Sequence, residues 1–177
     1  MSQPTSFSPE IAQDSELILL AQMKYKARDY QGASIAYTKV IQLNLHNAMT
    51  FCDRGGVYYR LGDLKSAMND YTHAIELDPS LEIAYYRRGF LHYLAKNYAG
   101  AICDYNHSIE LKPDFALAYA NRGYAYRDLH GEQEALIDWR FAAKLFKDQG
   151  NLKKHESTMK LITDVSGADS CVSGVLW

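Results

Sequence analysis

Apolar and polar residues along most of this chain follow the period of an amphipathic helix. Ala67, Tyr71 and Ala74, for example, recur at spacings of four and three residues, which places them on one helix face. Gly62-Asp63 and His130-Gly131 interrupt this pattern with residues that are typical of turns. The pattern predicts pairs of short helices joined by tight turns.

A longer regularity runs through the same stretch. Gly55, Gly89 and Gly123 are each separated by 34 residues. A fixed period of this size indicates a tandem array of helix pairs. Other positions that keep the interval are the alanines Ala67, Ala101 and Ala135, the aromatics Tyr71, Tyr105 and Trp139, the small residues Ala74, Ser108 and Ala142, and the prolines Pro79 and Pro113.

These positions resemble the tetratricopeptide repeat, a family built from antiparallel helix pairs in tandem. The unit "AYYRRGFLHYLAKNYAGAICDYNHSIELKP" (84–113) holds the small, aromatic and proline residues that the family places there. The chain departs from the family at Lys24 and His92, where a large apolar or aromatic residue is usual, and Leu45 stands where the first unit would have its proline. The resemblance implies an all-α fold, a right-handed α-solenoid of four helix hairpins.

A further helix is expected after the repeats. Gly150 is suited to end a helix, and Asn151 is suited to cap a new one whose Leu152 and Ile162 lie on an apolar stripe. Repeat arrays need a terminal element with a polar outer face, so this segment is the expected cap. The predicted division is a flexible tail at 1–13, repeat units at 14–47, 48–81, 82–115 and 116–149, a capping helix at 150–165, and a flexible tail at 166–177.

The repeated glycine and the arginine before it need an explanation, because glycine costs about 1 kcal/mol relative to alanine inside a helix. We expect the glycine to face an alanine across its hairpin, so that the two backbones approach closely. The arginine is followed 16 residues later by an aspartate, and residues equidistant from a hairpin turn lie near each other. We therefore expect Arg–Asp pairs between helices, within a hairpin or to its neighbour; a row of ligand-binding arginines is the alternative. The pairs are Arg54–Asp70, Arg88–Asp104 and Arg122–Asp138, and the first unit has Leu20 and Ala36 instead.

Composition narrows the classes of function. The chain has 177 residues, of which 47% are hydrophobic and 23% charged, as in ordinary soluble domains. A net charge of -2 gives no reason to expect nucleic acid or an anionic membrane as a partner. No segment reaches the roughly 20 apolar residues that span a bilayer, and residues 1–16 lack the pattern of a secretory signal. Cys52, Cys103 and Cys171 show no CxxC spacing, which fits reduced thiols and a cytoplasmic location.

No motif of a known type of catalytic or metal site is present. The chain contains no HExxH, no phosphate-binding glycine loop and no Ser/His/Asp arrangement. His73 and His107 lie one period apart, so the distance between packed helices would separate them by roughly 10 Å, too far to share one metal ion. The sequence therefore predicts a non-catalytic protein with no cofactor and no metal.

The family resemblance directs attention to the first helix of each pair, which lines a concave groove where peptides usually bind. Several residues at these positions are aromatic, and tyrosine is enriched at binding hot spots because it offers a large contact area at a small cost in side-chain entropy. Packing between repeats is the alternative role for these rings. The candidate groove residues are Met49, Tyr59, Ile83, Tyr86, Arg87, Phe90, Tyr93, Leu117, Asn121, Tyr124 and Arg127.

This apolar and aromatic groove with a basic rim favours a protein partner, namely a hydrophobic peptide or helix that carries some acidic residues. Several family members bind the C-terminal carboxylate of heat-shock chaperones with a set of Lys, Asn and Arg side chains. Here Ile18 and Gln22, or Cys52 and Gly56, stand where the lysine and asparagine would be. Arg87 and Asn121 have the right character but lie in the wrong units. A carboxylate clamp of that kind is not expected.

The leading hypothesis is a scaffold, adaptor or assembly factor that binds its partner in the groove. The alternative is self-assembly into homo-oligomers through the repeat ends or the terminal Val-Leu-Trp (175–177). RNA binding through aromatic and arginine side chains is a third hypothesis, against which the near-neutral charge argues. The chain is also similar to short bacterial repeat proteins, common in cyanobacteria, which implies roles in assembling membrane or photosynthetic complexes.

Overall fold

The computed structural model describes residues 9–43 and 47–172, and within these ranges it contains helices and no strand. The all-α class and the helix-hairpin repeat predicted from the sequence are confirmed. Most of the predicted N-terminal tail (1–8) and the terminal Val-Leu-Trp (175–177) lie outside the described residues, as does the side chain of Cys171. The helices of the described chain are α1 (Pro9–Lys26), α2 (Tyr30–Leu43), α3 (Ala48–Leu61), α4 (Leu64–Leu77), α5 (Glu82–Leu94), α6 (Tyr98–Leu111), α7 (Ala116–Asp128), α8 (Glu132–Asp148) and α9 (Leu152–Val172).

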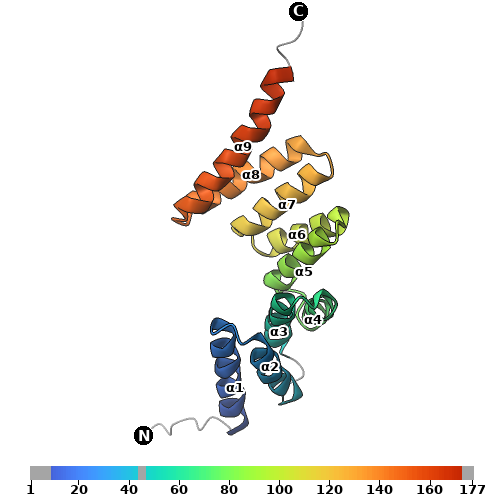
Figure 1. The fold of residues 1–177 in the computed structure, drawn as a ribbon, viewed down its shortest axis with the longest axis vertical. Coiled ribbons are helices and arrows are strands. Elements are labelled where there is room, and N and C mark those ends of the chain that lie inside the picture. Colours follow the sequence, from blue (N-terminus) through green and yellow to red (C-terminus); the bar gives the residue numbers. More distant parts are fainter. Residues whose placement is uncertain (1–8, 44–46, 173–177) are drawn as a thin grey trace, which may run out of the picture. The chain divides into compact units, whose positions relative to one another are not determined.

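The chain divides into two compact units, Met1–Ala84 and Tyr85–Trp177, and the division falls near the start of α5. Within the first unit, α1 packs on α2, α2 on α3 and α3 on α4 (Figure 1). Within the second unit, α6 packs on α7, α7 on α8 and α8 on α9 (Figure 1). Each unit therefore consists of consecutive antiparallel helices, as the 34-residue period predicts.

The turns inside the hairpins share one backbone conformation. Each contains a residue in the left-handed region, which is strained for any residue except glycine. At three turns the next residue also caps the second helix. Asp29 accepts a hydrogen bond from the N–H of Gly32 at 2.8 Å, Asp63 accepts one from the N–H of Ser66 at 3.0 Å, and Asn97 accepts one from the N–H of Gly100 at 3.1 Å. The left-handed residues lie one period apart, with φ of 63° at Arg28, 82° at Gly62, 59° at Lys96 and 66° at His130.

The repeated glycine faces an aromatic ring, so the expected contact with an alanine is wrong. A Cβ atom on Gly55 would lie 2.7 Å from Cε1 of Tyr71, and one on Gly123 would lie 2.5 Å from Nε1 of Trp139. Gly89 has the same arrangement in its hairpin. The absence of a side chain lets the ring of the second helix lie directly on the backbone of the first.

All three of the Arg–Asp pairs expected from the sequence form, and they form within a hairpin rather than between neighbours. Each guanidinium donates two parallel hydrogen bonds to its carboxylate, an arrangement that is strong and specific in geometry. The aspartates are buried, at 3 to 6% exposure. The Nε and Nη2 distances are 2.8 and 2.8 Å for Arg54–Asp70, 2.9 and 2.7 Å for Arg88–Asp104, and 2.7 and 2.6 Å for Arg122–Asp138.

Arg54 and Arg122 also bond to the preceding hairpin. Arg54 Nη1 donates to Oγ1 of Thr38 on α2 at 3.2 Å, and Arg122 Nη1 donates to Oδ1 of Asn106 on α6 at 2.6 Å. Thr38 and Asn106 occupy the same place in their repeats, two periods apart. A single guanidinium thus joins three helices, and sequence reasoning had proposed either connection but not both.

Helix α9 covers the end of the last hairpin. Ile162 on α9 is buried in one cluster with Ala135, Trp139 and Ala143 of α8. Asn151 caps α9 by accepting a hydrogen bond from the N–H of Lys154 at 3.2 Å. The helix continues to Val172, past the predicted boundary at 165. Over the described ranges, no helix combines the length and apolar character needed to cross a bilayer.

Candidate functional site

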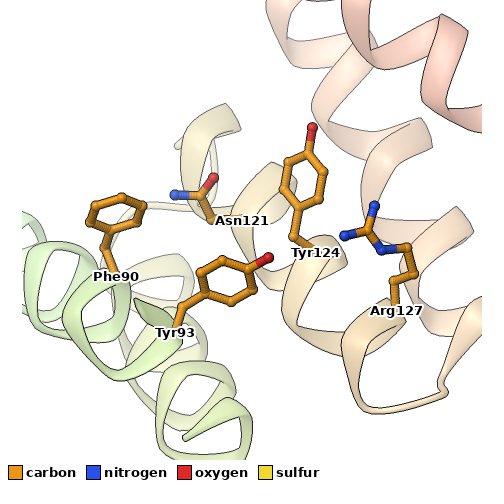
Figure 2. A pocket seen from close by; sticks show the side chains of 5 residues that line it. All are labelled: Phe90, Tyr93, Asn121, Tyr124 and Arg127. Carbon is orange, nitrogen blue, oxygen red and sulfur yellow. The ribbon is translucent and has the colours of Figure 1, made fainter. Parts of the chain in front are cut away.

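The candidate site is a pocket of about 270 Å³ between α5 and α7, in the second unit. Phe90 and Tyr93 are three residues apart on α5, and Asn121, Tyr124 and Arg127 follow the same spacing on α7, so each set shares a helix face. Figure 2 shows the five side chains around the pocket. All five belong to the groove residues predicted from the sequence.

The carboxylate of Asp128 accepts hydrogen bonds from two residues that line the pocket. Tyr93 donates its hydroxyl proton to Oδ2 of Asp128 at 2.7 Å, and Arg127 donates from Nε to Oδ1 of Asp128 at 2.9 Å. The two bonds tie a residue of α5 to two residues of α7. Asp128 therefore fixes the orientation of both a ring and a guanidinium at the pocket.

Arg127 also contacts two aromatic rings. Its guanidinium carbon lies 5.2 Å from the ring centroid of Tyr124 and 6.0 Å from that of Trp139, within cation–π range. Tyr124 meets Trp139 edge to face, with ring centroids 5.4 Å apart. Trp139 is fully buried and donates its indole N–H to the carbonyl of Ala120 at 3.1 Å. Tyr124, which lines the pocket, therefore packs against a buried and hydrogen-bonded residue of the core.

Asn121 is positioned by a second tyrosine of α5. Its Nδ2 donates to the hydroxyl of Tyr86 at 3.2 Å. The Tyr86 ring packs against Phe115 and Tyr105, with centroid distances of 4.8 and 6.0 Å. Because Tyr86 supports Asn121 but does not line the pocket, its role is to position the amide.

The electrostatics of the site follow from burial and from these bonds. Burial, with the hydrogen bond to Asp128 as a smaller cause, raises the pKa of Tyr93 to about 12. Burial also raises the pKa of Tyr86 and of Tyr124. For Asp128, burial opposes ionisation, but the hydrogen bonds from Tyr93 and Arg127 outweigh it and hold the pKa below its usual range. At neutral pH the site therefore contains neutral tyrosines beside an ionised Arg–Asp pair.

This arrangement is suited to binding. The volume lies just below the usual range of about 300–1,000 Å³ for small-molecule pockets. Three rings supply apolar contact area, and an amide and a guanidinium supply polar groups at fixed positions. Among the residues that the structure describes, no three His, Cys, Asp or Glu side chains are grouped as metal ligands.

The remaining predicted groove residues do not line this pocket. Met49 and Tyr59 lie on α3, and Ile83 lies at the start of α5, all within the first unit. Arg87 lies on α5, where it is partly buried. Leu117 borders a different hollow, together with Phe115 and Phe146.

Sequence reasoning missed the supports of the pocket. Asp128 was not among the candidate groove residues, and Trp139 was recognised only as a repeated aromatic position. The signal for Trp139 was present in the sequence, because Trp139 follows Gly123 by 16 positions, as Tyr71 follows Gly55. The Tyr93–Asp128 bond had no such signal, because the two residues are 35 positions apart and hold different places in their repeats.

Comparison with known families supports the repeat assignment. The family model described as TPR repeat, for tetratricopeptide repeat, matches residues 55–96. This range includes the end of one predicted unit and the start of the next. No curated protein sequence matches the chain significantly.

Solved structures with the same fold cover most of the chain. MamA superposes with a TM-score of 0.68 at 18% identity, over 93% of this chain and 98% of that chain. The TPR domain of Arabidopsis OM64 gives 0.64 at 25% identity, over 67% and 98%. The first TPR of Spaghetti (RPAP3), bound to the HSP90 peptide SRMEEVD, gives 0.65 at 25% identity, over 67% and 94%. These likenesses support a tetratricopeptide-type interaction module.

Proposed function

We propose that this chain is a non-catalytic scaffold or adaptor that binds a peptide or helix of a partner protein in the pocket between α5 and α7. The observation that carries the proposal is the convergence of Phe90, Tyr93 and Tyr124 with two polar side chains on one small pocket. Rings held by a buried core and by Asp128 are preorganised, so binding costs little ordering entropy.

The chemistry of the pocket defines the expected partner. An apolar side chain of the partner fills the space between the rings. Asn121 and Arg127 lie at the same pocket and are donors suited to a carbonyl or carboxylate oxygen. The partner segment is therefore hydrophobic with an acidic residue close to the inserted side chain.

The structure of a similar domain with a bound peptide supports this class of ligand. The TPR domain of Spaghetti holds a peptide, SRMEEVD, that combines apolar and acidic residues. The present chain lacks the Lys and Asn residues of a carboxylate clamp at Cys52 and Gly56. We infer recognition of an internal segment rather than of a chain end. The cytoplasm is the proposed setting, with assembly of larger complexes as the proposed role.

The test is selection of random peptides displayed on phage against the full chain, followed by affinity measurement with fluorescence anisotropy. The expected peptides carry a Leu, Ile, Met or Phe next to Asp or Glu. Phe90→Ala is expected to weaken their binding by about tenfold or more, as for a hot-spot aromatic.

The matched control is Phe141→Ala, which removes the same ring from an exposed site on α8. This variant is expected to bind the selected peptides as the parent does. Equal affinity of the parent and of Phe90→Ala would overturn the proposal, provided that both melt at the same temperature.

A further inference from the structure

A second hollow, of about 420 Å³, lies in the second unit, where the loops before α7 and α9 meet the end of α8. Its apolar lining comes from Phe115, Leu117 and Phe146, and the side chain of Phe146 is buried. Gln149 donates from Nε2 to the carbonyl of Asp114 at 2.8 Å, which joins the two loops. The hollow therefore has an apolar floor that the core and a hydrogen bond between the loops support.

Two lysines line this hollow together with the apolar residues. The ammonium nitrogen of Lys112 lies 5.4 Å from the ring centroid of Phe115, and that of Lys154 lies 5.5 Å from the ring centroid of Phe146, both within cation–π range. Asp114 is the acidic residue of the lining, so the lining carries one net positive charge. An apolar floor beside two ammonium groups fits an apolar side chain that has a carboxylate next to it.

The surface around the hollow is basic as well. Residues 140–160 contain six basic and two acidic side chains, whereas the whole chain has a net charge of -2. All six basic side chains are exposed, and clustered charges of one sign raise the local concentration of oppositely charged ligands. This part of the chain therefore favours an acidic partner. The basic residues are Arg140, Lys144, Lys147, Lys153, Lys154 and Lys160, and the acidic ones are Asp148 and Glu156.

The hollow and the peptide pocket share one face of α7. Leu117 lines the hollow, and Asn121 and Tyr124 line the pocket. Spacings of four and three residues place these three side chains on the same side of the helix. From Leu117 to Tyr124 the helix rises by about 10 Å, at about 1.5 Å per residue. One partner segment that lies along this face can therefore reach both sites.

The amide of Asn121 lies on this face between Leu117 and Tyr124, and it favours an extended partner. The N–H and C=O groups of an extended segment are open to such an amide, whereas those of a helix are bonded within the helix. An extended chain advances about 3.3 Å per residue and points every second side chain to the same side. Two residues are then too short for the distance, and four residues, which cover about 13 Å, are sufficient.

We propose that this hollow is a second subsite for the partner segment that the pocket between α5 and α7 binds. The segment is extended, and the apolar residue four positions from the one in the pocket enters the hollow. An Asp or Glu next to that second apolar residue pairs with Lys112 and Lys154. The subsite rests on the proposed function and adds to it the spacing and the charge of the partner.

The probes are the phage-selected peptides, and their binding to the full chain is measured by fluorescence anisotropy. They are expected to carry two large apolar residues four positions apart, with Asp or Glu next to one of them. Lys112→Glu/Lys154→Glu is expected to weaken their binding by about fivefold or more, because like charges then face each other. The matched control is Lys144→Glu/Lys160→Glu, which makes the same change in charge at exposed positions of α8 and α9 outside the hollow. Its effect is expected to stay below about twofold, as for surface charges that make no direct contact.

Peptides that lack the second anchor separate the two proposals. With Ala for the second apolar residue and Gln for its acidic neighbour, they are expected to bind the parent and Lys112→Glu/Lys154→Glu equally, which also shows that the variant is folded. Intact peptides that respond to Phe90→Ala but not to Lys112→Glu/Lys154→Glu overturn the subsite and leave the proposed function standing. An equal effect of the Lys144→Glu/Lys160→Glu control overturns the subsite as well. Peptides that do not respond to Phe90→Ala overturn the proposed function and the subsite with it.

Discussion

Arg122 on α7 and Asp138 on α8 are joined by two parallel hydrogen bonds, from Nε to Oδ2 at 2.7 Å and from Nη2 to Oδ1 at 2.6 Å. The aspartate is only 3% exposed. The remaining guanidinium nitrogen bonds to Asn106 of the previous hairpin. The pair thus connects the helices within one repeat and connects that repeat to the one before.

Removing one partner of the Arg122–Asp138 pair is expected to destabilise the fold strongly. Replacing both partners with apolar residues is expected to change the free energy of unfolding much less. Asp138→Ala leaves the guanidinium without its partner and is expected to lower the free energy of unfolding by about 3–5 kcal/mol. Arg122→Leu/Asp138→Ala copies the Leu20 and Ala36 found in the first unit. The double variant is expected to recover most of the loss. Urea denaturation of the parent, both single variants and the double variant measures the four values; a double variant as unstable as Asp138→Ala contradicts the prediction.

Lys96 and Gly62 occupy equivalent turn positions in the left-handed region, so replacing one by glycine and the other by alanine is expected to change stability in opposite directions. Lys96 has a φ of 59°, which costs a non-glycine residue about 1–2 kcal/mol. Lys96→Gly removes this strain but gives the unfolded chain more freedom, so a net gain of about 0.5 kcal/mol is expected. Gly62→Ala introduces the strain and is expected to lose about 1 kcal/mol. Thermal unfolding of both variants tests this prediction. A shift of both melting temperatures in the same direction would contradict it.

The glycine of each hairpin is expected to tolerate no side chain. In Gly123→Ala, the new Cβ would lie 2.5 Å from the indole of Trp139, which is fully buried and cannot move aside. The expected loss is about 1–3 kcal/mol from overpacking, despite the better helix propensity of alanine. Gly131→Ala is the control, since the atom nearest to its Cβ would be Oε2 of Glu134 at 3.1 Å, at the end of a flexible side chain. A Gly123→Ala variant as stable as the parent in urea would show that the close approach is not required.

Tyr93 gives the pocket a measurable pH dependence. Its pKa of about 12 lies above the ordinary value of about 10, so its contribution to stability is complete below pH 10 and is lost as the pH rises toward 12. The difference in absorbance at 295 nm between the parent and Tyr93→Phe isolates this titration. Asp128→Asn is expected to lower the Tyr93 pKa only in part, because burial is the larger cause. A midpoint near 10 in the parent would show that Tyr93 is exposed and not bonded to Asp128.

The sequence was sufficient for the hairpins and for the pairs inside them. The positions of Gly55, Tyr71 and the Arg54–Asp70 pair repeat at one interval, and the two helices of a hairpin meet in a register that the turn fixes. Any two residues equidistant from that turn must therefore lie close together. This is why the charged pairs could be predicted without a structure.

The pocket depended on the tertiary structure. Whether Tyr93 reaches Asp128, and whether Arg127 lies over Tyr124, depends on how α5 and α7 pack and on side-chain length, and no period specifies either. The sequence named eleven groove residues, and five of them converge on one pocket. What the sequence alone determined is the repeat and its internal contacts, because these are set by local register. Only the tertiary structure decided which side chains meet across hairpins, because those contacts depend on the packing of separate helices.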